Sequence, residues 1–261
     1  MHNGLWEAYA IRYAWHHRTA RENFLGAGDI HDGPMPIDYF VWALRSNEKV
    51  YVLDTGFDEA MAKKRGRNFV KSPGDGLRQL GIDPAAVQDV LISHMHYDHC
   101  GNHGLFPNAR YHVQDREMFF STGRYMTHPH MRFPFDEEDV VAMVRRLYQG
   151  RLVFHDGDDE IAPGLSLHRV GGHSMGLQMV RAKTRRGWLV LASDAAHYYA
   201  NMERGLPYPI LFNAGEVLEG YRRAYTLADS HDHVIPGHDP LVLQRYPAAL
   251  DETKGWIARL D

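Results

Sequence analysis

The chain has 261 residues, of which 44% are hydrophobic, enough for a full core; this excludes a disordered tail or a disulfide-stapled mini-protein. Lys and Arg number 29 against 33 Asp and Glu, so the net charge of -4 argues against nucleic acid or an anionic membrane as a partner. No run reaches the roughly 18 apolar residues of a membrane span. With one cysteine, Cys100, and no signal-type segment near the N-terminus, we expect a cytoplasmic protein.

The first predicted elements are two short strands and a helix. Apolar and β-branched runs at 37–45 and 50–54, separated by the polar stretch SNEK, are typical of a hairpin. Residues 75–80 predict a short helix that stops at a glycine. The run VLIS at 90–93 then predicts a buried strand that leads directly into His94.

The second half of the chain predicts alternating helices and strands. The stretch 119–134 has no helical or alternating period, which predicts a structured loop. Asp136 and Asn213 are typical N-caps of two amphipathic helices. Further strands are expected at 151–154, 165–170, 177–182, 188–193 and 233–235. No repeat or linker divides the chain, so we expect a single layered α/β domain over 1–261.

Histidine is unusually abundant, with 18 of 261 residues, and one segment concentrates it. His94, His96, Asp98 and His99 follow the predicted strand directly, so the first pair can face one point and the second pair a neighbouring one. That geometry suits two ions. Imidazole and carboxylate donors without a thiolate favour Zn²⁺, while Mn, Fe or Co are also acceptable.

Three single donors occur later in matching positions, each at the end of a predicted strand. His173 follows two glycines, Asp194 follows the strand ending at Ser193, and His238 follows Pro-Gly. Glycine or proline beside a donor lets the backbone turn tightly and present the side chain. We therefore assign His94, His96 and His173 to one ion, Asp98, His99 and His238 to the other, and Asp194 to both as a bridge.

The motifs HxHxDH, GGHS, SDAA and PGHD together resemble the metallo-β-lactamase superfamily over essentially the whole chain. Within it, LISHMHYDHCGN followed by LFPNARYHVQ is most similar to the N-acyl-homoserine lactonase group. The resemblance implies an αβ/βα four-layer sandwich with a dinuclear zinc site at the sheet edges. It also implies that Asp54, in VYVLDTG, supports the metal loops from behind.

The resemblance implies a metal-dependent hydrolase that opens a small lactone, either a quorum-quenching substrate or a related catabolic ring. A metal-bridging hydroxide would attack the carbonyl carbon, and Asp98 would carry a proton to the leaving oxygen. One position departs from the group. Its members have a tyrosine three residues after the bridging Asp, where this chain has His197 followed by Tyr198. Either residue takes the tyrosine's part at the carbonyl, or the substrate differs.

Other functions of the same fold stay open at this point. A thioester hydrolase of glyoxalase II type uses nearly the same ligands, although the segment after His238 is short for its usual helical domain. A phosphodiesterase needs a basic arm that the charge balance does not supply. A homodimer is also an open alternative. Six aromatic residues either line a substrate pocket or pack the loops: Phe24, Tyr39, Phe133, Phe135, Tyr208 and Phe212.

Overall fold

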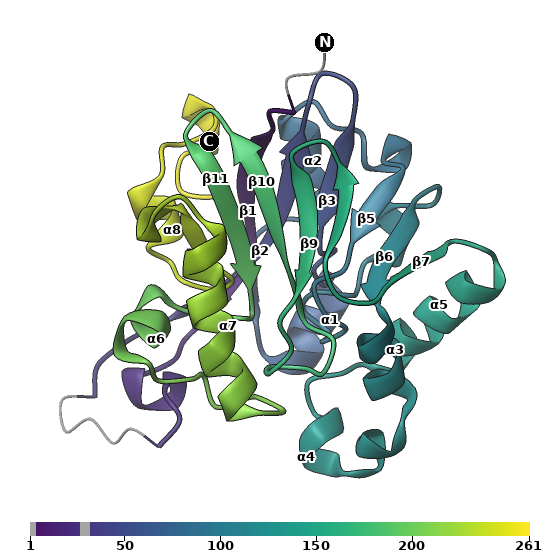
Figure 1. The fold of residues 1–261 in the computed structure, drawn as a ribbon, viewed down its shortest axis with the longest axis vertical. Helices are drawn as coiled ribbons and strands as arrows, with labels where there is room; N and C mark the ends of the chain where they lie inside the picture. Colours follow the sequence, from purple (N-terminus) through teal and green to yellow (C-terminus); the bar gives the residue numbers. More distant parts are fainter. Residues whose placement is uncertain (1–3, 27–31) are drawn as a thin grey trace.

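The computed structural model describes residues 4–26 and 32–261, which form two β-sheets flanked by helices (Figure 1). The first sheet has eight strands. In spatial order they are β13 (Ile257–Arg259), β1 (Glu7–His16), β2 (Ile37–Arg45), β3 (Val50–Leu53), β5 (Asp89–Leu91), β6 (Arg110–Gln114) and β7 (Leu152–His155), with β4 (Asn68–Phe69) paired to β1. Neighbours are antiparallel from β13 to β3 and parallel from β3 to β7.

The second sheet has five strands and packs against the first. Its order is β12 (Val234–Pro236), β11 (Gly187–Ser193), β10 (Gln178–Thr184), β9 (Leu165–Arg169) and β8 (Asp159–Ala162). Only the β11–β12 pair among these is parallel.

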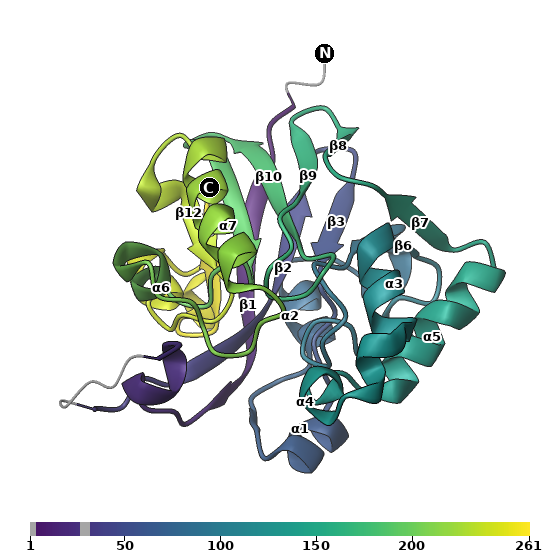
Figure 2. The same cartoon turned by 60° about the horizontal axis from the view of Figure 1, so that its bottom comes forward.

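Helices flank the two sheets and the loops at their ends (Figure 1). They are α1 (Glu59–Arg65), α2 (Pro73–Gln79), α3 (Asp115–Thr122), α4 (Pro129–Arg132), α5 (Glu137–Tyr148), α6 (Tyr199–Arg204), α7 (Ala214–Leu227) and α8 (Val242–Arg245). Short 3₁₀ turns lie at Ala20–Asn23, Pro84–Ala86, His103–Leu105, Arg124–Thr127, His231–His233 and Asp251–Thr253. Figure 2 shows α7 outside the second sheet and α3 and α5 outside the first.

Alternation along β2 explains the layers. Phe40 and Trp42 join the core between the sheets, where they meet residues of β9, β10 and β11. Val41 and Ala43 point the other way, into the core under α2, α3 and α5. A strand buried on both faces reads as a continuous apolar run, as β2 does. The arrangement of helix, sheet, sheet and helix confirms the expected αβ/βα four-layer sandwich.

Several predicted elements are confirmed with small shifts of their ends. The hairpin is β2 and β3, and the strand predicted at 90–93 is β5, which already ends at Leu91. The Asp136 side chain caps α5 by accepting from Glu138 N, and Asn213 caps α7. The strands predicted at 151–154, 165–170, 177–182, 188–193 and 233–235 correspond to β7, β9, β10, β11 and β12.

The prediction of a loop over 119–134 is wrong. This stretch holds the end of α3, a 3₁₀ turn and the single-turn helix α4. Helical pieces this short are too brief to show a period in the sequence. Among the described residues, no helix is both long and apolar enough to traverse a bilayer.

Candidate metal centre

The predicted donors come together where the loops at the ends of four strands meet. His94 to His99 follow β5 of the first sheet. His173 follows β9, Asp194 follows β11 and His238 lies two residues after β12, all three in loops of the second sheet. The centre therefore lies between the two sheets and takes donors from both.

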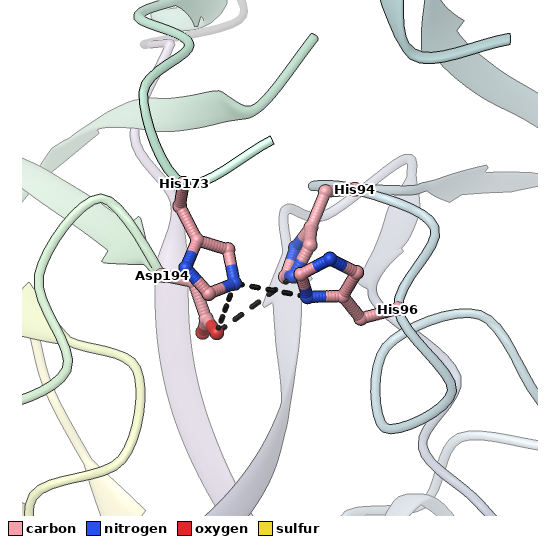
Figure 3. Close-up of side chains that lie close together, drawn as sticks. All are labelled: His94, His96, His173 and Asp194. Carbon is pink, nitrogen blue, oxygen red and sulfur yellow. Dashed lines mark hydrogen bonds and ion pairs between the residues drawn. The ribbon is translucent and has the colours of Figure 1, made fainter. Parts of the chain in front are cut away.

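The first group contains His94, His96, His173 and Asp194, whose donor atoms all lie within 4.8 Å of one another. Figure 3 shows the three imidazoles and the carboxylate pointing toward one place. His173 Nε2 lies 2.9 Å from His96 Nδ1 and 3.1 Å from Asp194 Oδ2. His94 Nε2 lies 3.7 Å from the same carboxylate oxygen.

The second group contains Asp98, His99 and His238, again with donor atoms within 4.8 Å. Asp98 Oδ2 lies 3.6 Å from His99 Nε2 and 3.8 Å from His238 Nε2. Asp194 Oδ1 lies 3.2 Å from His99 Nε2 and 2.9 Å from His238 Nε2. Asp194 thus directs Oδ2 toward the first group and Oδ1 toward the second.

Hydrogen bonds on the far side of four imidazoles set their orientation. Each ring directs Nδ1 at an oxygen: His94 at Ser93 Oγ (3.0 Å), His99 at Asp54 Oδ2 (2.7 Å), His173 at the Ile210 carbonyl (2.7 Å) and His238 at the Asp38 carbonyl (2.7 Å). These acceptors require the proton on Nδ1. Each ring therefore directs its Nε2 into the centre, the nitrogen through which a metal ligand of this kind binds.

Buried atoms at the centre lack hydrogen-bond partners among the described residues. They are His94 Nε2, His99 Nε2, His238 Nε2 and Asp194 Oδ1. Buried polar atoms are otherwise nearly always paired. Cations between them would satisfy all of these atoms at once. The nitrogen and oxygen donor set fits Zn²⁺, so the residues present fit a pair of divalent ions.

Burial and mutual proximity shift the pKa values of the cluster. Burial, with the charges of His99 and His96 adding to it, holds the pKa of His94 well below its usual range. For Asp194, burial alone would raise the pKa, but the surrounding imidazoles of His197, His238 and His99 bring it well below its ordinary value. His94 is thus held neutral and Asp194 ionised, the states in which both side chains bind metals.

Asp54 supports the centre from behind, as the resemblance implied. Its fully buried carboxylate accepts from Ser93 N at 2.7 Å, from Ser93 Oγ at 2.8 Å and from His99 Nδ1. Asp54 has a φ of +63°, in the left-handed region that Asp and Asn tolerate better than most residues. That conformation lets one side chain serve both the end of β5 and His99.

Only one of the two residues considered for the carbonyl lies at the centre. His197 Nε2 is 3.1 Å from Asp194 Oδ2, and its ring stacks on Tyr208 at 3.7 Å between centroids. Burial lowers the pKa of His197 to about 3, against the opposing effect of Asp194. Tyr198 is buried, and its hydroxyl donates to the Pro36 carbonyl at 3.2 Å.

A cavity of about 50 Å³ lies beside the first group, with His96 and His173 in its wall. The rest of its lining is mostly apolar: Phe120, His130, Met131, Phe133, Pro134, Ile210, Leu211 and Phe212. Two of the six aromatic candidates, Phe133 and Phe212, are among these. The others pack: Phe135 on the His96 ring, Tyr39 on His238, Tyr208 on His197 and Phe24 against Arg204.

Two contributors to this centre carry no signal in the sequence. Glu117 is a fully buried acid that contacts the loops of both His96 and His173. In the sequence it looks like any acid in a first helical turn. Asp38 contributes its main chain: its carbonyl faces His238 Nδ1, and its N–H donates to the His238 carbonyl at 2.9 Å. No side-chain motif reports such contacts.

Comparison with known proteins agrees with this geometry. The family model described as "Metallo-beta-lactamase superfamily" matches residues 36–238. A protein of Rhizobium radiobacter called N-acyl homoserine lactonase AttM is 30% identical over 173 residues, 64% of this chain and 63% of that protein. A crystal structure described as a quorum-quenching N-acyl homoserine lactone lactonase has a TM-score of 0.74 at 22% identity, covering 92% of this chain and 94% of the other. A further structure, AidC, described as a dizinc quorum-quenching lactonase in complex with a product, has a TM-score of 0.68 at 17% identity, covering 89% and 87%.

Proposed function

The chain belongs to the metallo-beta-lactamase superfamily, and on that basis we propose that it is a dinuclear zinc hydrolase that opens the ring of a small lactone. One observation carries the proposal: the two oxygens of Asp194 face two separate groups of donors, as a bridging carboxylate requires. The relatives at about 30% identity are called N-acyl homoserine lactonases. The match spans less than two thirds of the length of those relatives, so their substrate is a guide to this chain's substrate class.

Each proposed ligand set comes from one group of donors. His94, His96 and His173 would hold one ion, Asp98, His99 and His238 the other, and Asp194 both. When bound, the ion pair lowers the pKa of a water toward ~7 and polarises an ester carbonyl. Mn, Fe or Co would suit the same donors.

Asp98 is suited to carry a proton during ring opening. Its Oδ2 is the oxygen nearest His99 and His238, which leaves Oδ1 free for a reacting group. Tyr13 donates to the Asp98 carbonyl at 2.7 Å and so fixes the backbone of this residue. A carboxylate held this way can take a proton from the attacking water and pass it to the departing ring oxygen.

His197 takes the part at the carbonyl that the lactonase tyrosine has. Its imidazole lies next to Asp194 and between His173 and His238, at 4.9 and 5.1 Å between ring centroids. A neutral imidazole carries one N–H, which in this structure faces Asp194 Oδ2 at 3.1 Å. Once metal ions held that carboxylate, the same N–H would be available to a carbonyl oxygen as negative charge develops there. The stacked Tyr208 ring keeps His197 in this orientation.

The apolar cavity beside His96 and His173 supports a substrate with an apolar substituent next to the ring. Its volume of about 50 Å³ is far below the ~300 Å³ or more of a typical ligand pocket. The cavity accommodates a small group, and a longer acyl chain would extend past the exposed Phe133.

The direct test is a pH-stat assay of purified, zinc-loaded protein. The substrates are acyl-homoserine lactones of several chain lengths, simple γ- and δ-lactones, a glutathione thioester and a chromogenic phosphodiester. Acid release with lactones, abolished in Asp194→Asn, is the expected result. Acid release with the thioester or phosphodiester alone would reject the proposal in favour of the glyoxalase II or phosphodiesterase alternative.

Metal content is tested separately by elemental analysis after gentle purification. We expect about two ions per chain, because the two donor groups are distinct. Chelation should abolish lactone hydrolysis and lower the thermal midpoint, and added Zn²⁺ should restore both. Less than one ion per chain, in protein reloaded with excess zinc, would contradict the paired centre.

A further inference from the structure

Glu117 lies in the first turn of α3, and its side chain is 0% exposed. Three donors surround its carboxylate. Oε1 accepts from Met95 N at 2.8 Å, and Oε2 accepts from Ser174 Oγ at 2.7 Å and from Gly176 N at 2.9 Å. Burying a carboxylate is costly unless such contacts compensate it, so these three hydrogen bonds keep the acid in place.

The partners of Glu117 belong to two different ligand loops. Met95 stands between His94 and His96, in the loop after β5. Ser174 and Gly176 follow His173, in the loop between β9 and β10 of the other sheet. One carboxylate therefore connects the backbones that carry three donors of the first group.

Packing at this contact is close enough to need a glycine. A Cβ on Gly176 would lie 2.2 Å from Glu117 N and 2.6 Å from Glu117 Cα. The loop after His173 therefore rests directly on the first turn of α3. The position of α3 therefore determines the position of the loop, because close-packed backbones cannot shift independently.

We propose that Glu117 is a positioning residue that sets the spacing between His96 and His173 by holding both of their loops on one buried carboxylate. The inference rests on the proposed function, since it gives Glu117 a role toward the first metal ion. Glu117 touches none of the proposed ligands' donor atoms and acts only through the backbone and Ser174.

The test is Glu117→Gln, which keeps size and shape. A glutamine must turn its NH₂ toward either Met95 N–H or Gly176 N–H, and each choice sets two donors against each other. One loop is then released. We expect the Zn²⁺ affinity of the first site, held by His94, His96 and His173, to fall by about 10–100-fold, as when a group that orients a ligand is removed.

Three readouts separate positioning from general stability. They are Zn²⁺ affinity by chelator competition, the absorption spectrum of the Co²⁺-substituted protein, and urea unfolding of the metal-free protein. The matched control is Asp89→Asn, a buried acid at the opposite end of β5 that binds Arg110 and His112. It should lower stability while leaving both affinities and the Co²⁺ spectrum unchanged.

The outcomes discriminate between the two proposals. Wild-type protein that binds no metal refutes the proposed function itself. If wild-type protein binds two ions and Glu117→Gln has the same Zn²⁺ affinities and Co²⁺ spectrum, the positioning role alone is overturned. If Glu117→Gln does not fold, Ser174→Ala decides, because it removes one donor and leaves the buried carboxylate in place. We expect it to weaken the same site several-fold, and an unchanged affinity would overturn the inference.

Discussion

His99 directs its Nδ1 at Asp54 Oδ2 across 2.7 Å, and the same oxygen accepts from Ser93 Oγ at 2.8 Å. The hydrogen bond joins the turn after β3 to the loop after β5, two parallel neighbours in the first sheet. It fixes the ring of His99 so that Nε2 faces Asp194 and Asp98. The orientation of this donor is therefore set by a residue 45 positions earlier in the chain.

Asp54→Asn should weaken zinc binding while preserving the fold. Asparagine tolerates the φ of +63° at this position, but its amide cannot accept from both Ser93 and His99 as the carboxylate does. We expect a loss of about 10–100-fold in affinity, measured by chelator competition. Asp136→Asn, at the buried cap of α5, is the control and should bind zinc as wild type does. Equal affinities in both variants would argue against the supporting role of Asp54.

His197→Ala and Tyr198→Phe should separate the two candidates at the carbonyl. Loss of His197 should lower kcat by about 10²–10³-fold, the effect of removing one oxyanion donor, with both zinc ions retained. Tyr198→Phe removes only a hydroxyl that donates to Pro36, so its kcat should stay near wild type. Steady-state kinetics with metal analysis provides the measurement. The reverse pattern would assign the role to Tyr198.

Gly172→Ala should be more destabilising than a matched glycine substitution. Gly172 has a φ of +86°, and a Cβ there would lie 2.5 Å from Val217 N in α7. Gly81 has a φ of +74° with open space around it, so Gly81→Ala measures the backbone strain alone. We expect an additional cost of about 1–3 kcal/mol for Gly172→Ala from overpacking, read from urea unfolding of the metal-free proteins. Similar costs for the two variants would show that α7 can move aside.

Asp139 should make stability depend on pH. Burial, with the nearby charges of Asp136 and Asp58, raises its pKa from 3.8 to about 7. The folded state therefore holds this proton more tightly than the unfolded state, and stability falls as pH rises from about 4 to about 7.

The measurement is urea unfolding of metal-free wild type and Asp139→Asn between pH 4 and 8. The free energy of unfolding of the variant should equal that of wild type near pH 4, because the neutral amide resembles the protonated acid. As pH rises, the variant should become more stable than wild type. Glu138→Gln, an exposed neighbour, serves as control and should follow the wild-type profile. If the free energy of unfolding of Asp139→Asn changes with pH as that of wild type does, the titration does not belong to Asp139.

Local chemistry made the donors predictable. HxHxDH directly after a strand, and single donors beside Gly or Pro at later strand ends, depend on backbone geometry that a few residues determine. The helix caps at Asp136 and Asn213 are local in the same way. The structure brings all seven of these residues close together, with Asp194 between the others. Their assignment as ligands of two ions stays a prediction. The span of one domain over 1–261, the cytoplasmic location and the homodimer stay predictions.

What the sequence could not provide depends on contacts between distant segments. The first turn of α3 gains its buried carboxylate only because a loop about 60 residues later packs on Glu117. The second ring nitrogens of His173 and His238 find their acceptors at Ile210 and Asp38, which are main-chain carbonyls. Any residue type supplies a carbonyl, so no motif could reveal these partners.

The division of donors between the sheets has a consequence for dynamics. The loop after β5 and the loops after β9, β11 and β12 come from opposite layers, and the ions would be shared between them. Neither sheet, with its loops, could then unfold locally without releasing metal. In the metal-free protein we expect the amides of β5 and β11 to exchange independently of each other. In the metal-bound protein they should exchange in a single cooperative opening.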